Sequence, residues 1–129
     1  MLIASISGIR GTLGQKVGND LTETDVRLFV ESFARLVKSK SGSTKVVVGR
    51  DARESGKWIK KITISVLIEN DMDVVDLDLA TTPTVEMAVT REHARGGVII
   101  SASHNPIEWN GLKFLNSKGE IVNEKEGRR

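Results

Sequence analysis

The spacing of apolar residues along this chain predicts helices and strands that alternate. Apolar positions three and four residues apart predict amphipathic helices over residues 21–40 and 55–70, and from a turn at 81–84 to about residue 93. Apolar and β-branched runs predict strands over residues 45–48, 73–79 and 97–101. A turn at residues 116–119 predicts a terminal hairpin of residues 112–115 and 120–122.

The first predicted helix has signals at both ends. Thr22, followed three positions later by Asp25, has the pattern of a capped helix start. Ser41 and Gly42 predict that the helix ends before them.

Strands that alternate with helices imply βαβ units and a sheet covered on both faces. We therefore expect a three-layer α/β/α domain with a mainly parallel, mixed sheet. Ligands of such sheets bind beyond the carboxyl ends of the strands. The loops after Val48, Leu79 and Ile100 are expected to share that edge, which would bring Arg50, Thr82 and Ser103 together.

The composition excludes several kinds of protein. The 129 residues correspond to a single domain. With 19 basic and 17 acidic residues the net charge is +2, so no overall field favours nucleic acid or an anionic membrane. The lack of cysteine excludes disulfides, thiolate chemistry and cysteine-ligated zinc. We expect a soluble cytoplasmic protein, because the sequence has no signal-like start and no apolar run of about 20 residues.

The segment from residue 99 to residue 114 is the strongest candidate for chemistry. A buried apolar strand ending at Ile100 gives way abruptly to polar and turn-forming residues. Ser103 is therefore predicted in a loop on a rigid strand, where catalytic residues often lie. From loop position alone, a solvated or helix-capping role is the more frequent one for such a serine.

This segment resembles the active-site serine loop of the α-D-phosphohexomutases, the family of phosphoglucomutase, phosphomannomutase and phosphoglucosamine mutase. The family loop has the sequence Thr-Ala-Ser-His-Asn-Pro, followed by Asn-Gly and Lys. The chain matches it at Ala102, Ser103, His104, Asn105, Pro106, Asn110, Gly111 and Lys113, with Ser101 in place of the threonine. Two further motifs resemble the same family: Gly8-Ile9-Arg10-Gly11, interpreted as a turn, and Gly49-Arg50-Asp51 with Arg53 and Ser55-Gly56.

The resemblance implies roles for the candidate catalytic residues. Ser103 would carry a phosphate in the resting enzyme and donate it to the substrate. Lys113 would act on the phosphoserine as a charge clamp or general base, and Arg10 and Asn105 would bind phosphate. His104 is either a proton donor or acceptor beside Ser103 or a histidine that supports the loop. In another context, Lys113 would be an exposed strand lysine and Arg10 an arginine on a tight turn.

The charges of the third motif suggest supporting residues, and the resemblance implies a metal. Arg50, Asp51 and Arg53 are expected to form an ion-pair cluster that supports the loop without contacting substrate. Mg²⁺ would be bound through the phosphate on Ser103 and by an Asp-Gly-Asp-x-Asp loop that this chain lacks. The aspartates between residues 71 and 78 alternate with apolar residues and lack the glycine and glutamate of a calcium loop, so we assign them no metal role.

The implied protein is a phosphohexomutase whose N-terminal, catalytic-serine domain, of the domain I type, is formed by residues 1–129. It would interconvert hexose 1-phosphate and hexose 6-phosphate through hexose 1,6-bisphosphate, which would also be its activator. Its partners would be the phosphosugar and the remaining domains of the same chain, and the isolated domain is expected to be inactive. Two other classes stay open: a non-catalytic phosphosugar-binding module, and a scaffold that binds another chain.

Overall fold

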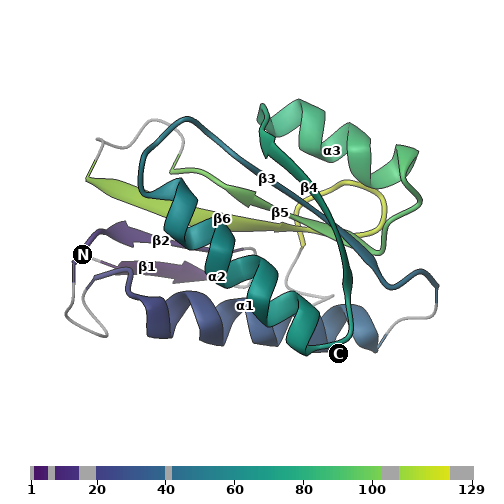
Figure 1. Cartoon of the computed structure of the whole chain (residues 1–129), viewed down its shortest axis with the longest axis horizontal. Helices are drawn as coiled ribbons and strands as arrows, with labels where there is room; N and C mark the ends of the chain where they lie inside the picture. Colours follow the sequence, from purple (N-terminus) through teal and green to yellow (C-terminus); the bar gives the residue numbers. More distant parts are fainter. Residues whose placement is uncertain (1, 6–7, 15–19, 40–41, 103–107, 123–129) are drawn as a thin grey trace.

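The computed structural model describes residues 2–5, 8–14, 20–39, 42–102 and 108–122. Within them, six strands and three helices follow one another along the chain (Figure 1). They are β1 (Leu2–Ser5), β2 (Gly8–Thr12), α1 (Glu23–Lys38), β3 (Lys45–Arg50), α2 (Gly56–Glu69), β4 (Asp73–Leu79), α3 (Thr82–Arg91), β5 (Gly96–Ile100) and β6 (Trp109–Leu115).

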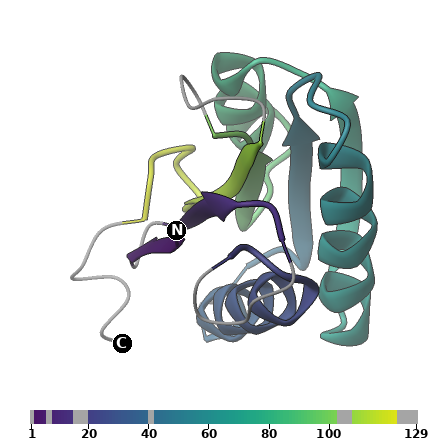
Figure 2. The ribbon, with the colours of Figure 1, turned by 90° about the vertical axis from the view of Figure 1, so that its left-hand side faces the viewer.

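The strands form one mixed sheet in the order β1-β2-β6-β5-β3-β4. The strands that alternate with helices, β3, β4 and β5, pair in parallel, whereas β6, β2 and β1 join the sheet as antiparallel neighbours. Helices α1 and α2 lie on one face and α3 lies on the other (Figures 1 and 2). The predicted three-layer α/β/α fold with a mixed sheet is confirmed.

Each face of the sheet has its own apolar core. On the α1 face, Val26, Val30 and Phe33 pack against sheet residues such as Phe114, and the rings of Phe33 and Phe114 stack with centroids 4.8 Å apart. On the α3 face, a smaller cluster contains Val85 and Ile99, among others. The sheet is therefore anchored to helices on both sides.

The predicted start of the first helix is confirmed. Thr22 accepts the backbone N–H of Asp25, and the Asp25 carboxylate accepts the backbone N–H of Thr22, which makes a capping box. The helix starts at Glu23 instead of residue 21, because Leu21 is buried in a bridge to Leu13. It ends at Lys38, before the predicted stop.

Other predicted elements differ from the structure only at their ends. Strand β4 has the predicted bounds, and α2 differs by one residue at each end. Strand β3 continues to Arg50, since Arg50 pairs with both Leu79 and Ile100. The predicted turn at 81–84 is the start of α3, where the Thr81 hydroxyl accepts the backbone N–H of Thr84.

The prediction for the N-terminal motif was wrong. Gly8 to Gly11 form the first four residues of strand β2 and not a turn. A Cβ atom on Gly8 would collide with the carbonyl oxygen of Leu112, and one on Gly111 would lie 2.6 Å from the carbonyl oxygen of Ile9. Glycine on these strands therefore permits close strand pairing, where the sequence had suggested chain reversal.

The end of the described chain makes a hairpin-like return. Strand β6 begins at Trp109, three residues before the predicted strand. The chain turns after Leu115 and pairs back through a Leu115–Ile121 bridge. The backbone N–H of Val122 donates to the carbonyl of Phe114 at 3.0 Å.

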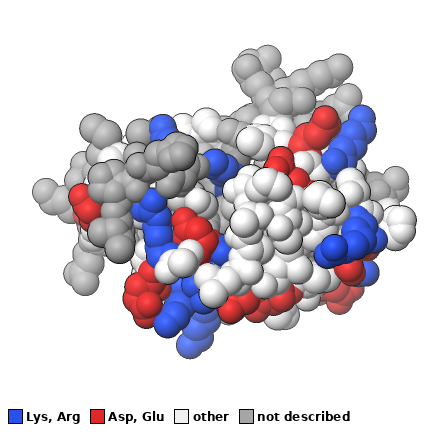
Figure 3. All heavy atoms as spheres, turned by 90° about the horizontal axis from the view of Figure 1, so that it is seen from above, with Lys and Arg blue, Asp and Glu red and all other residues white. Residues whose placement is uncertain are grey.

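The surface over α3 carries few charges. Seen from above, this face shows a broad uncharged area with acidic and basic groups around it (Figure 3). The helix sequence explains the area, because Glu86 and Arg91 are the charged residues in α3. Its exposed positions include Met87, which is 67% exposed.

Candidate active site

The loops after the parallel strands meet at one edge of the sheet. The backbone N–H of Asp51, just after β3, donates to the carbonyl of Ile100 at the end of β5 at 3.0 Å. The backbone N–H of Ala80, just after β4, donates to the carbonyl of Arg50 at 3.0 Å. The carboxyl ends of β3, β4 and β5 are thus adjacent, as the alternation of elements predicted.

The candidate serine segment leaves and re-enters the sheet at this edge. Ser103, His104 and Asn105 lie outside the described residues, which stop at Ala102 and resume at Glu108. On the leaving side, the backbone N–H of Ser101 donates to the carbonyl of Gly111 at 2.9 Å. On the returning side, the carbonyl of Glu108 accepts the backbone N–H of Leu13 at 2.8 Å.

Residues 51–55, here called the 51–55 loop, hold both flanks of that segment. Asp51 binds the carbonyl of Ile100 before the segment, and Arg53 Nη1 donates to the carbonyl of Trp109 after it at 2.8 Å. The fully buried Asn110 donates from Nδ2 to Ser55 Oγ at 2.8 Å. One loop therefore sets the distance between the two anchor points of the segment.

The 51–55 loop is itself braced by Arg50, Asp51 and Arg53, the three predicted supporting residues. The Asp51 carboxylate accepts the backbone N–H of Arg53 at 3.1 Å and pairs with Arg53 Nε at 3.3 Å. Arg50 Nη1 donates to the carbonyl of Asp51 at 3.3 Å. These contacts bring the three residues together and connect them to the main chain at Trp109.

A second set of ionic contacts lies on the β4 side of Arg50. Arg50 Nε and Lys60 Nζ each lie 2.8 Å from Asp78 Oδ1, and Lys60 Nζ lies 3.0 Å from Asp76 Oδ2. The hydrogen bond from Lys60, followed in size by the one from Arg50, lowers the pKa of Asp78. The hydrogen bond to Asp78, followed in size by the one to Asp76, raises the pKa of Lys60. Both groups are therefore charged at neutral pH.

Arg10 and Lys113 occupy neighbouring positions on the α3 face of the sheet. Arg10 pairs with Gly111, and Lys113 pairs with Gly8, so the two side chains are diagonal neighbours on adjacent strands. Such diagonal positions are roughly 7–8 Å apart between Cα atoms. Their strand neighbours Ile9 and Leu112 belong to the core on the α1 face. Two basic side chains thus share a face next to the strand ends that flank the serine segment, an arrangement suited to an anion.

Two residues of this edge make contacts that the sequence does not indicate. Asp78 looked like one more polar position of a strand, yet it is the carboxylate partner of Arg50. Ser55 looked like a helix-start residue, yet its hydroxyl accepts from Asn110. Both contacts join elements far apart in the sequence, and neither has a local pattern.

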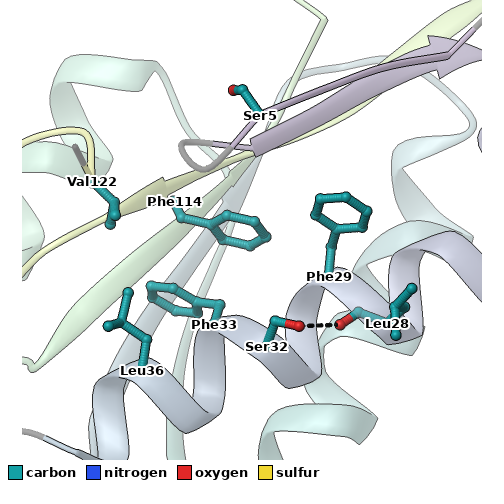
Figure 4. Close-up of a pocket in the computed structure, with 8 residues that line it drawn as sticks. All are labelled: Ser5, Leu28, Phe29, Ser32, Phe33, Leu36, Phe114 and Val122. Carbon is teal, nitrogen blue, oxygen red and sulfur yellow. Dashed lines mark hydrogen bonds between the residues drawn. The ribbon is translucent and has the colours of Figure 1, made fainter. Parts of the chain in front are cut away.

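The structure also has an apolar groove away from this edge (Figure 4). Its volume is about 340 Å³, and it lies on the α1 face. It is lined by Ser5, Leu28, Phe29, Ser32, Phe33, Leu36, Phe114 and Val122. None of these lining side chains is charged, so the groove offers no cation to a phosphate.

Two further kinds of feature are absent from the described residues. No three histidine, cysteine, aspartate or glutamate side chains stand close enough there to hold a metal ion together. Within the same residues, none of the helices combines the length and the apolar character that crossing a bilayer requires.

Comparisons with known proteins identify the fold class first. A crystal structure of a putative phosphomannomutase from Thermus thermophilus superposes with a TM-score of 0.85 at 26% identity, over 98% of this chain and 28% of that one. The fold is thus that of an α/β/α domain found in phosphosugar mutases. A family model, phosphoglucomutase/phosphomannomutase, alpha/beta/alpha domain I, matches residues 2–128. The chain belongs to the phosphoglucomutase/phosphomannomutase family, as the sequence motifs predicted.

Curated relatives carry several substrate names. A phosphoglucosamine mutase from Helicobacter pylori is 33% identical over 99% of this chain. A probable phosphoglucosamine mutase from Methanothermobacter thermautotrophicus is 39% identical over 88%, and a phosphopentomutase from Thermococcus kodakarensis is 41% identical over 92%. The chain spans only 28%, 24% and 24% of their lengths, respectively. The relatives thus agree on mutase chemistry and differ in the sugar.

Proposed function

We propose that this chain is the serine-bearing N-terminal domain of a phosphohexomutase that interconverts hexose 1-phosphate and hexose 6-phosphate. The observation that carries the proposal is the place of the serine segment. Its flanks lie at the carboxyl edge of the sheet, and Arg10 and Lys113 share the adjoining sheet face. Family membership supports the same reaction class.

In the proposed reaction, phosphorylated Ser103 donates its phosphoryl group to a free hydroxyl of the sugar phosphate. The bond between Ser103 Oγ and phosphorus breaks, a bond from the sugar oxygen to phosphorus forms, and the hydroxyl proton passes to a base. Hexose 1,6-bisphosphate results and reorients in the site, so that its other phosphate faces Ser103. It then transfers this second phosphoryl group to Ser103. The sugar leaves with its phosphate moved, and the serine is again phosphorylated.

The basic residues have distinct parts in this scheme. Arg10 has a planar fork that suits two phosphate oxygens, and Lys113 supplies a point charge near the transferring group. Preorganised cations of this kind stabilise the charge of a phosphoryl transition state. Lys113 or His104 accepts the proton, and Asn105 binds a phosphate oxygen. Arg50, Asp51 and Arg53 support the loop.

The proposed enzyme uses Mg²⁺, with one ligand from this chain, an oxygen of the Ser103 phosphate. The ion, when bound, polarises the phosphoryl oxygens and orients the group. The other ligands and the sugar-binding groups belong to further domains of the same polypeptide, so the isolated domain is inactive. Hexose 1,6-bisphosphate serves as the activator that loads Ser103, and the enzyme works in the cytoplasm.

The test is the phosphorylation state of the natural protein. The gene product is purified from its source cells, its intact mass is measured, and its phosphopeptides are mapped. A longer chain with phosphate on Ser103 is the expected result. A free chain of about this length with unmodified Ser103 would refute the proposal and favour a phosphosugar-binding module.

A further inference from the structure

Asp78 has an unusual backbone conformation at the end of β4. Its φ angle is 56°, in the left-handed region that residues with a side chain seldom adopt. The pairing register between β3 and β4 shifts at the same place, where Val48 pairs with Asp76 but Gly49 pairs with Asp78. The extra residue is therefore Leu77, and the resulting bulge turns the Asp78 side chain out of the regular strand alternation.

This conformation brings the Asp78 carboxylate to Arg50. The guanidinium side chain of Arg50 is only 8% exposed, and its Nε atom lies 2.8 Å from Asp78 Oδ1. Burial removes water that would otherwise solvate this cation, and the half-exposed Asp78 carboxylate supplies an opposite charge in its place. Lys60 approaches the same oxygen from α2, so Asp78 joins three elements: β3, β4 and α2.

The contacts of Asp78 continue without a break to the serine segment. Asp78 pairs with Arg50, whose Nη1 donates to the carbonyl of Asp51. The Asp51 carboxylate pairs with Arg53, whose Nη1 donates to the carbonyl of Trp109. Asp51 also donates its backbone N–H to the carbonyl of Ile100. Both flanks of the segment are thus connected to one carboxylate on β4.

We propose that Asp78 is a positioning residue that sets the place of the serine segment through Arg50 and the 51–55 loop. The inference rests on the proposed function, because it gives the segment a phosphate-carrying serine to place. It goes beyond that function, because a residue of β4 that contacts Arg50 and not the segment itself would then affect the rate of the reaction.

The alternative is that Asp78 only stabilises the fold. Asp76 provides a matched control, since it is on the same strand, is paired with the same Lys60, and has no ion pair with Arg50 among the described contacts. Its Oδ1 accepts the backbone N–H of Asp78 at 2.8 Å, and the amide oxygen of an asparagine can still accept this bond, so Asp76→Asn removes only the charge. Asp78→Asn removes the charge and keeps a residue that tolerates the left-handed region. Asp78→Gly removes the carboxylate and relieves the backbone, so it separates loss of the contact from strain.

The experiment uses the full-length enzyme and four variants: Asp78→Asn, Asp78→Gly, Asp76→Asn and Ser103→Ala. Steady-state kcat and KM are measured together with backbone hydrogen exchange in the peptide that covers residues 100–110. A displacement of the serine of about 1 Å costs up to about a hundredfold in rate. We expect both Asp78 variants to lower kcat about tenfold or more, with KM nearly unchanged, and to speed exchange in this peptide. Asp76→Asn is expected to leave both readouts near the wild-type values.

The outcomes separate this inference from the proposed function. If Ser103→Ala is inactive while both Asp78 variants keep wild-type kcat and wild-type exchange, Asp78 does not position the segment and the inference is overturned. An Asp76→Asn variant that matches the Asp78 variants in both readouts would also overturn it, since a general loss of stability would then suffice. Full activity of Ser103→Ala would instead refute the proposed function. The exchange comparison of the two aspartates would still decide whether Asp78 holds the segment.

Discussion

The two faces of this sheet present opposite surfaces. On the α1 face an apolar groove of about 340 Å³ lies among aromatic and aliphatic side chains, including Phe29, Phe33 and Phe114. On the α3 face, beside the carboxyl edge, Arg10 and Lys113 lie on adjacent strands. Consecutive residues of strand β6 thus contribute to the two surfaces, because Phe114 faces the groove and its neighbour Lys113 faces the other side of the sheet.

This contrast shows that the volume of a cavity does not by itself identify the reactive surface. An apolar groove holds apolar groups well, but a phosphate leaves water only where cations and hydrogen-bond donors replace its solvation. The charged edge has those groups, together with a loop that holds both flanks of the serine segment. The comparison predicts that substitutions on the two faces have different consequences: loss of turnover on one and loss of stability on the other.

The largest effect is expected for Ser103→Ala in the full-length enzyme. Without the hydroxyl no phosphoserine forms, so turnover falls by at least about a thousandfold, as for other enzymes that lose a covalent nucleophile. Mutase assays with hexose 1-phosphate measure the loss. Ser117→Ala is the control, because Ser117 is exposed in the turn after β6, away from the carboxyl edge. Near-normal turnover of Ser103→Ala would show that the reaction does not take place at the charged edge.

The next largest effect is expected on the apolar face. Phe114→Ala deletes a side chain that is 3% exposed and stacked on Phe33. Removing a buried phenylalanine costs about 3–5 kcal/mol of unfolding free energy. Urea unfolding measures this loss, and Leu28→Ala, at a position 60% exposed, is the control with little effect. Turnover per folded molecule should stay unchanged, and a specific loss of kcat would contradict the division between the two faces.

Lys113→Ala tests the charged face one residue away. We expect kcat/KM to fall about a hundredfold, which is the usual cost of removing one group that stabilises transition-state charge. The unfolding free energy should change far less than in Phe114→Ala, since Lys113 is only partly buried. Lys118→Ala, an exposed lysine in the turn after β6, is the matched control. An unchanged kcat/KM for Lys113→Ala would contradict the proposed clamp.

The smallest effect is a pH dependence of stability that comes from Asp78. Lys60 and Arg50 lower the pKa of its carboxyl group below the ordinary value of 3.8. The contribution is therefore present above that value and is lost as the pH falls through the lower folded-state pKa. Urea unfolding of the wild type and Asp78→Asn should differ at pH 7, and the difference should shrink as the pH is lowered below about 4. A difference that stays constant would show that the charge of Asp78 contributes nothing. The effect is small because this side chain is half exposed to solvent.

Much of the fold could be predicted because its signals are local. The capping box at Thr22 and the helical spacing of Val26 and Val30 belong to one helix, and the bounds of β4 follow from polar and apolar residues that alternate within one stretch. Strands β1 and β2 had no such signal, since both are short and the glycines of β2 are equally typical of turns.

The candidate site could be predicted in part for the same reason. The serine motif is contiguous in sequence, and family membership supports it. The roles of Ser103, His104, Asn105, Lys113 and Arg10 stay predictions. The Arg50–Asp78 pair depends on a bulge and a left-handed backbone, which alternating polar and apolar residues do not indicate. Long-range contacts of this kind are visible only once the strands are paired.

The anchors of the serine segment have a consequence for the order of folding. The contact between Arg53 and the carbonyl of Trp109 closes a sequence separation of 56 residues, and the intervening chain contains α2, β4, α3 and β5. Contacts with long sequence separation form slowly, because the chain between them must first lose its entropy. The contacts between the 51–55 loop and the flanks of the serine segment should therefore form late, after the parallel strands have assembled. A nascent or partly folded chain would contain Ser103 but would lack these contacts. Phosphorylation of Ser103 would then occur only in completely folded molecules and could serve as a measure of complete folding.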